Sequence, residues 1–264
     1  MKSSKSPLKG KPLRNPGEST DIALREYFWD KFFPYLLATF MFGYIALMDW
    51  YRYMTDSPVM PWHFTIVFIT ALALTSYKFL KIKPIIRNMK LGRDGEKTVG
   101  QFLESLRESG AKVFHDIPGD NFNLDHIVIT TAGIFLIETK TYSKPARGEP
   151  TITFDGQSVT LRERGSFEAP VIQVKAGSVW LRELLKTSTG RDFPIRPVLA
   201  FPGWFVQPTA EAKKSRIWVL NPKALPAFIS NSSACISSDD VHLAAYHLSR
   251  YIRTYEEGRG SFGY

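Results

Sequence analysis

Charged side chains gather in one short and otherwise apolar stretch of the chain, DHIVITTAGIFLIETK, at residues 125–140. Asp125 and Glu138 carry the hard oxygen atoms that magnesium and manganese prefer as ligands. Lys140 places an ammonium two residues beyond Glu138, on the same face of a strand. These residue types point to a divalent cation site, provided that the fold brings them together.

A tight β-hairpin is the element expected to do this, because β-branched runs at residues 127–131 and 134–139 flank a short turn. If Thr131 and Ala132 form the turn, Asp125 lies directly opposite Glu138. If Ala132 and Gly133 form it, Asp125 faces Lys140 and Glu138 is its diagonal neighbour. Either register brings two carboxylates and one ammonium within roughly 5–8 Å. Like charges that face each other weaken a sheet, so Mg²⁺ or Mn²⁺ is expected to offset them. The plainer alternative is an ordinary cross-strand Asp–Lys pair on a surface-facing strand, worth roughly 0.2–1 kcal/mol.

The wider pattern resembles the metal-dependent nuclease core written PD-(D/E)-x-K, and more specifically the nuclease-related (NERD) domain. The matching motifs are Gly92-x-x-Gly95-Glu96 opening a helix, Leu124-Asp125-His126, the run GIFLIETK at 133–140, and Gln173 downstream. The resemblance covers residues 91–205. It implies an α/β fold of the restriction-endonuclease-like kind, with a mixed central sheet flanked by helices.

The resemblance also implies an activity, namely magnesium- or manganese-dependent hydrolysis of phosphodiester bonds in nucleic acid, with DNA favoured over RNA. Asp125, Glu138 and the carbonyl of Thr139 would hold the metal. Lys140 would orient or activate the attacking water, or stabilise charge on phosphorus. Gln173, on a helix after the Glu-x-Lys strand, would support the metal site or contact a phosphate.

Glu96 has two interpretations. Asp94 predicts an N-cap for a helix that follows a basic linker at 84–93 and runs to about Ser109. Glu96 would then lie in the first turn and complement the helix dipole, for about 0.3–1 kcal/mol. The resemblance makes it an additional ligand of the metal or of water. His115 and His126 are also nearby, and each is expected to be a packed residue without a functional role.

The remaining pattern predicts alternating strands and helices. Strands are expected at 112–117, 150–154, 158–162, 197–201 and 217–220, and helices at 169–186, 222–230 and 240–255. Trp204 and Phe205 are expected to cover the core. Residues 206–264 are interpreted as an α/β extension packed on the nuclease-like domain, with a frayed end from Gly258 onward.

Two apolar runs precede this domain, and they predict a transmembrane hairpin with helices at about 30–50 and 61–80, within a segment 28–83. Residues 1–27 are expected to be a disordered basic tail, in which Lys2, Lys5, Lys9, Lys11 and Arg14 either contact anionic lipid or are solvated and only set the orientation. A buried helical hairpin of a soluble protein is the alternative. Basic residues lie outside both runs, which predicts an inner-membrane protein with both termini and the nuclease-like domain in the cytoplasm.

The charge distribution bears on function. Residues 1–93 hold 14 Lys and Arg against 6 Asp and Glu, which leaves 20 against 19 for the rest of the chain. The excess base therefore flanks the apolar runs and does not mark a nucleic-acid footprint on the domain. A membrane-tethered module that binds nucleic acid or signals without catalysis is for this reason the competing hypothesis. The single cysteine, Cys235, excludes an intrachain disulfide.

Overall fold

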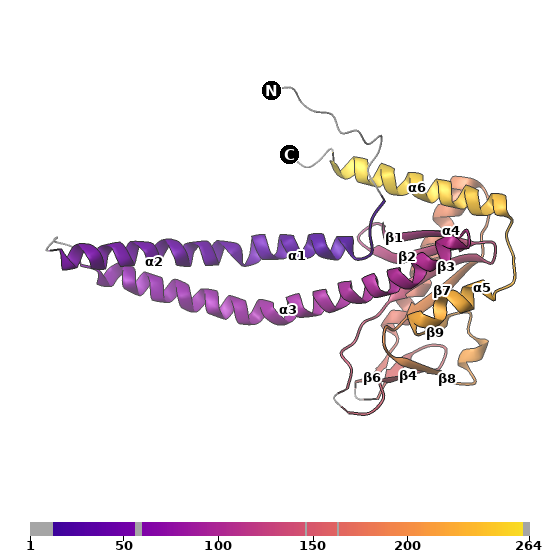
Figure 1. Ribbon diagram of the computed structural model, residues 1–264, viewed down its shortest axis with the longest axis horizontal. Helices are drawn as coiled ribbons and strands as arrows, with labels where there is room; N and C mark the ends of the chain where they lie inside the picture. The colour runs from indigo at the N-terminus through magenta and orange to yellow at the C-terminus, as the bar shows by residue number, and fades with distance from the viewer. Residues whose placement is uncertain (1–12, 56–59, 146, 163, 261–264) are drawn as a thin grey trace, which may run out of the picture. The chain divides into compact units, whose positions relative to one another are not determined.

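The computed structural model describes residues 13–55, 60–145, 147–162 and 164–260. The chain divides into two compact units, one formed by residues 19–91 and the other by residues 1–18 together with 92–264. Figure 1 gives the order of the elements along the chain.

The smaller unit contains α1 (Glu18–Lys31), α2 (Phe33–Met54) and the first part of α3 (Trp62–Glu108). Two helical stretches, Glu18–Met54 and Trp62–Glu108, are long and apolar enough to cross a membrane by length and composition, and only 11% of the most apolar window of each is buried. Inside the unit, α2 and α3 are joined by a hydrogen bond of 2.7 Å between the hydroxyls of Thr39 and Thr75. A Cβ on Gly43 would stand 2.9 Å from the Phe68 ring, so glycine permits this close helix contact.

Helix α3 corrects one prediction, because it continues without a break through residues 84–93 to Glu108. There is no linker, and Asp94 is not an N-cap; its carboxylate accepts hydrogen bonds from the guanidinium of Arg93. Pro84 lies inside the helix, and the residues that follow it are mostly good helix formers, which outweigh the one missing backbone donor.

The prediction of a disordered tail over residues 1–27 is also wrong from Leu13 onward. Arg14 is buried, and its guanidinium pairs with Glu256 at 2.5 Å and Asp116 at 3.4 Å. The two carboxylates offset the cost of burying the cation. Helix α1 begins at Glu18. The four lysines expected to face lipid, Lys2 to Lys11, lie outside the described residues.

The main sheet of the larger unit is mixed, with strand order β1-β2-β3-β7-β9. Strands β1 (Lys112–Pro118), β2 (Asn123–Thr130) and β3 (Gly133–Thr139) form an antiparallel meander. Strands β7 (Ile195–Ala200) and β9 (Trp218–Leu220) run parallel to β3. The domain is therefore α/β with a mixed central sheet flanked by helices, as predicted.

Each face of this sheet has its own hydrophobic core. Residues such as Ile127 and Leu136 pack on one face against Leu181 of α4 (Ala169–Thr189) and Leu248 of α6 (Ser238–Gly260). On the other face, Val128 and Phe135 belong to a second cluster with residues 99–106 of α3 and with α5 (Leu225–Ser230). The continuous β-branched runs of β2 and β3 follow from burial on both faces.

A second, smaller sheet has the order β6-β5-β4-β8. It is formed by β4 (Thr151–Phe154), β5 (Val159–Leu161), β6 (Gly165–Phe167) and β8 (Phe205–Pro208), and two short 3₁₀ helices, Ala212–Lys214 and Pro222–Ala224, flank β9. Trp204 is buried as expected, whereas Phe205 is 57% exposed, because it begins the edge strand β8. Helix α6 reaches Gly260, so the expected fraying does not begin at Gly258. Residues 261–264 lie outside the described part of the chain.

Candidate functional site

The register of the central hairpin places the two carboxylates of the predicted site opposite each other. Thr130 pairs with Gly133 and His126 with Ile137, so Thr131 and Ala132 form the turn. Continuing that register sets Asp125 against Glu138. Of the two registers left open by the sequence, the structure has the one that brings like charges face to face.

Four side chains and one backbone group then form a connected network at the ends of β2 and β3. The Asp125 carboxylate accepts a hydrogen bond of 2.7 Å from the backbone N–H of Thr139. The Lys140 ammonium donates to Glu138 Oε1 at 2.9 Å and to Gln173 Oε1 at 2.7 Å. Gln173 Nε2 donates to the same Glu138 oxygen at 2.7 Å. Glu138, Lys140 and Gln173 thus form a closed triangle of contacts beside Asp125.

Helix α4 brings Gln173 to this network because Gly177 lets the helix approach the sheet closely. A Cβ at Gly177 would lie 2.8 Å from Leu124 Cδ2 and 3.0 Å from Leu136 Cδ2. Gln173 stands four residues earlier, on the same side of the helix, and so faces the same two strands. The expected association of Gln173 with the Glu-x-Lys strand is present in the structure.

Glu96 approaches the site from α3, and its alternative role as a helix-dipole residue is wrong. It lies well inside a helix that begins at Trp62, far from any first turn. Its charge is one of the causes that raise the pKa of Asp125. Beside it, Gly95 packs on Thr141, where a Cβ would stand only 1.9 Å from Oγ1. Glycine at 95 is therefore what lets this turn of α3 approach the end of β3.

The electrostatics of the carboxylates are those of a site that lacks compensating charge. Burial, and then repulsion from Glu138 and Glu96, raises the pKa of Asp125 well above its usual value. Burial also raises the pKa of Glu138, although Lys140 opposes the shift. Burial lowers the pKa of Lys140, but the ion pair with Glu138 outweighs it and the net shift is upward, so the group stays an ammonium. The Lys140 ammonium therefore interacts with both Glu138 and Asp125, and the pKa values of both carboxyl groups are still raised.

These donors fit magnesium or manganese. Among the described residues there is no group of three or more His, Cys, Asp or Glu side chains arranged to enclose a metal ion. Mg²⁺, however, keeps several of its waters and is commonly bound through one or two carboxylates plus substrate phosphates. Asp125 and Glu138, with the Thr139 carbonyl at the same strand end, match that donor set.

Sequence reasoning missed a second polar cluster on the neighbouring strands. His115 Nδ1 and His126 Nδ1 are 2.8 Å apart, and His115 Nε2 lies 2.8 Å from Glu104 Oε1. Burial lowers the pKa of both imidazoles, well below the usual value for His126. The spacing of β1 and β2 could have suggested the pair, since two histidines fall on opposite strands, but only the register makes them partners.

Comparison with known proteins bears on this site directly. Residues 91–202 match the family model described as the nuclease-related domain (NERD). Residues 91–202 are a nuclease-related domain. The match ends three residues before the limit of 205 expected from the sequence, and it includes Glu96, Asp125, Glu138, Lys140 and Gln173.

Two further likenesses are slighter. An uncharacterized protein of Bacillus anthracis is 33% identical over 87 residues, which are 31% of this chain and 41% of that protein's length. A chain of SfsA from Pyrococcus furiosus, in a structure with Ca²⁺, is 17% identical and covers 47% of this chain and 52% of that one, with a TM-score of 0.22. A TM-score that low defines no common fold.

Proposed function

We propose that the nuclease-related domain hydrolyses phosphodiester bonds of nucleic acid with the help of Mg²⁺ or Mn²⁺, at a site of the PD-(D/E)-x-K type. The observation that carries the proposal is the placement of Asp125 opposite Glu138, with Lys140 bonded to Glu138 at 2.9 Å. Repulsion between carboxylates is a cost that a binding site for a cation repays, whereas a purely structural sheet would avoid it.

Each residue has a separate task in this proposal. Asp125, Glu138 and the Thr139 carbonyl hold the cation, which would neutralise the scissile phosphate and lower the pKa of bound water. Lys140 orients the attacking water and stabilises charge that builds on the phosphate oxygens. Gln173 fixes both Glu138 and Lys140 through its amide, which donates to one and accepts from the other. Glu96 adds negative charge on the α3 side and serves as a further ligand of the metal or its water.

A cleavage assay on the full-length chain in detergent tests the proposal. Labelled single- and double-stranded DNA and RNA are incubated with Mg²⁺, Mn²⁺ or a chelator. Cleavage that needs the metal and disappears in Glu138→Gln is the expected result. Glu183→Gln, at an exposed carboxylate elsewhere on α4, is the matched control and keeps full activity.

The competing function is a module that binds nucleic acid or signals without catalysis. The nearly balanced charge of residues 94–264, 20 basic against 19 acidic, favours it. Metal binding by the wild-type chain without cleavage of any of the four nucleic acids would decide for this alternative.

The same chain is proposed to sit in the inner membrane through α2 and the first part of α3, with the domain in the cytoplasm. Support comes from the exposure of large apolar side chains on these helices and from the basic residues outside both apolar runs. Cys235 is exposed and is the only cysteine of the sequence, so it serves as a native probe. An impermeant thiol reagent should leave Cys235 unlabelled in intact cells but label Thr55→Cys in a Cys235→Ser background. Labelling in the reverse pattern would contradict the orientation.

A further inference from the structure

Two adjoining cavities lie between the small sheet and the end of the main sheet, and neither has a role in the site described above. One has a volume of about 1090 Å³ and the other about 590 Å³. Both are lined by Lys144, Glu149 and Trp204, so the two cavities adjoin, and we call the pair the groove. We call the larger part the aromatic cleft and the smaller part the basic pocket.

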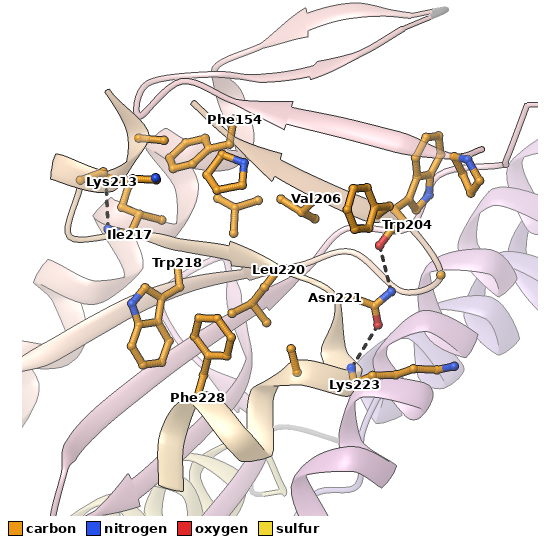
Figure 2. Close-up of a pocket in the computed structure, with 18 of the residues that line it drawn as sticks. Phe154, Trp204, Val206, Lys213, Ile217, Trp218, Leu220, Asn221, Lys223 and Phe228 are labelled. Carbon is orange, nitrogen blue, oxygen red and sulfur yellow. Dashed lines mark hydrogen bonds between the residues drawn. The ribbon is translucent and has the colours of Figure 1, made fainter. Parts of the chain in front are cut away.

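The aromatic cleft is bounded by rings and aliphatic side chains with lysines at its edge (Figure 2). Trp218 and Phe228 contact each other edge to face, with ring centroids 5.4 Å apart, and Phe228 is 48% exposed. Asn221 braces the wall, since its amide donates to the Trp204 carbonyl at 2.9 Å and its oxygen accepts from the Lys223 backbone at 3.1 Å. A flat, apolar group that carries negative charge is the complementary ligand.

The basic pocket, at the other end of the groove, is lined mainly by positively charged side chains. Among the described residues, its charged lining side chains are Lys144, Arg147, Arg162 and Arg164, with one carboxylate, that of Glu149. All four basic residues are exposed, and the Arg164 guanidinium lies over the Tyr142 ring, 5.9 Å from its centroid. Exposed guanidinium groups suit phosphate oxygens, which they can bind in a bidentate way. Residues 94–264 have almost balanced charge overall, but the described lining of the basic pocket has a local excess of positive charge.

The basic pocket is lined by Ser143 and Lys144, a few residues beyond the end of β3. Lys140, directly after β3, donates its backbone N–H to the carbonyl of Ala200, the last residue of β7, at 2.9 Å. Two residues later, the Tyr142 carbonyl accepts a hydrogen bond of 3.3 Å from the Trp204 indole, which lines the groove. Lys144 is four residues from Lys140, a reach of at most about 14 Å along the chain. A ligand that spans the groove thus leads toward Lys140 at the carboxyl ends of two parallel strands, where α/β sheets bind their ligands.

We propose that this groove binds a single-stranded segment of nucleic acid, with its phosphates in the basic pocket and an unpaired base in the aromatic cleft. The proposal rests on the nuclease function proposed above and names the form of its substrate. Bases of a duplex are stacked and paired inside it, so only an unpaired base can enter a cleft and stack on Phe228. A lipid headgroup would use the basic pocket but has no planar group for the rings.

Binding is measured by fluorescence anisotropy with the full-length chain in detergent, a labelled oligothymidylate and a chelator, so that no cleavage intervenes. Phe228→Ala should weaken binding about tenfold, within the range found when one stacking partner of a base is removed. Arg162→Ala combined with Arg164→Ala should weaken it further and lower the salt slope by about 1.4, which is two single-strand phosphate contacts. Tyr246→Ala and Arg253→Ala, exposed residues of α6, are the matched controls and should bind like the wild type.

Three outcomes would overturn the inference: a duplex of the same sequence that binds as tightly as the single strand, groove variants that bind like the α6 controls, or a wild-type chain that binds anionic vesicles and no oligonucleotide.

A separate cleavage assay with Mg²⁺ distinguishes failure of the groove proposal from failure of the nuclease proposal. Binding that depends on the groove residues, without any cleavage, would refute the nuclease proposal and leave the groove proposal standing. If metal-dependent cleavage is unchanged in Phe228→Ala and in the double arginine variant, the groove proposal is refuted and the nuclease proposal stands.

Discussion

Two clusters of buried polar groups lie on strands β1 to β3, and they handle charge in opposite ways. The histidine cluster is neutral: His115 and His126 share a short contact, and burial lowers both pKa values, so neither ring carries a positive charge at neutral pH. The carboxylate cluster holds Asp125 opposite Glu138 with a single ammonium nearby, and burial raises the pKa of both carboxyl groups, so ionising both costs free energy. The first arrangement carries no net charge that a ligand would have to offset, whereas a bound cation would offset the repulsion between the carboxylates in the second.

This difference in electrostatics indicates which of the two clusters is a candidate ligand-binding site. Polar residues that stabilise a fold are expected to satisfy one another, and the imidazoles largely do, although His126 Nε2 has no hydrogen-bond partner among the described residues. Repulsion between carboxylates that a neighbouring ammonium offsets only in part is instead expected where a ligand binds. Substitutions in the two clusters should therefore separate stability from activity.

The largest effect is expected from Lys140→Ala. Loss of the ammonium should lower metal-dependent cleavage by about 10²–10⁴-fold, because its task lies in the chemical step. The metal-dependent rise in melting temperature should persist, since the carboxylates remain. Steady-state cleavage and thermal melting of the same preparation measure the two effects. A variant that cleaves normally would remove Lys140 from the mechanism.

His115→Ala should show the reverse pattern. It leaves His126 Nδ1 without its partner and removes the contact with Glu104, which keeps its ion pair with Arg107, at a cost of about 1–3 kcal/mol in the free energy of unfolding. Cleavage per folded molecule and the metal-dependent melting shift should equal those of the wild type. Denaturant titration beside the activity assay provides the comparison, and a selective loss of cleavage would make the histidines part of the site.

The two clusters should also respond oppositely to pH in the absence of metal. The folded pKa of each histidine is lowered, so the unfolded chain binds more protons, and their contribution to stability is lost as pH falls through the unfolded value of about 6.5. The folded pKa of Asp125 and Glu138 is raised, so the folded chain binds protons first, and acidification toward their ordinary values relieves their repulsion. Melting from pH 7.5 to 5 should accordingly show a smaller loss for His115→Asn than for the wild type, and a smaller relief for Asp125→Asn. Parallel pH profiles would contradict both assignments.

Much of the site could be predicted from the sequence because its residues are close along the chain. The hairpin, Asp125, Glu138 and Lys140 come from one 16-residue run, and local alternation of side chains suffices to place them on one face. The register needed the structure, because a turn of Thr131 and Ala132 or of Ala132 and Gly133 fits the pattern equally well.

Other features depend on contacts between distant segments. Arg14 is buried and forms ion pairs with Asp116 and Glu256, which are far away in the sequence, so the local sequence pattern could not predict them. The helix break expected at 84–93 is absent, because one proline and one glycine in that segment do not outweigh the surrounding helix formers. The groove is lined by Lys144, Arg164, Trp204 and Phe228, which come from four separate segments, so the composition of the chain could not reveal it.

The most direct test of the account is a thermal melting titration of the full-length chain with Mg²⁺ and Mn²⁺. A concentration one hundred times the Kd should stabilise the domain by about 2.7 kcal/mol, a shift of several degrees. Glu138→Gln and Asp125→Asn should each abolish most of that shift while the metal-free melting temperature stays equal or rises slightly, and Glu183→Gln should behave as the wild type. An unchanged melting temperature of the wild-type chain at saturating metal, or an undiminished shift in both carboxylate variants, would contradict the assignment of Asp125 and Glu138 as a cation site.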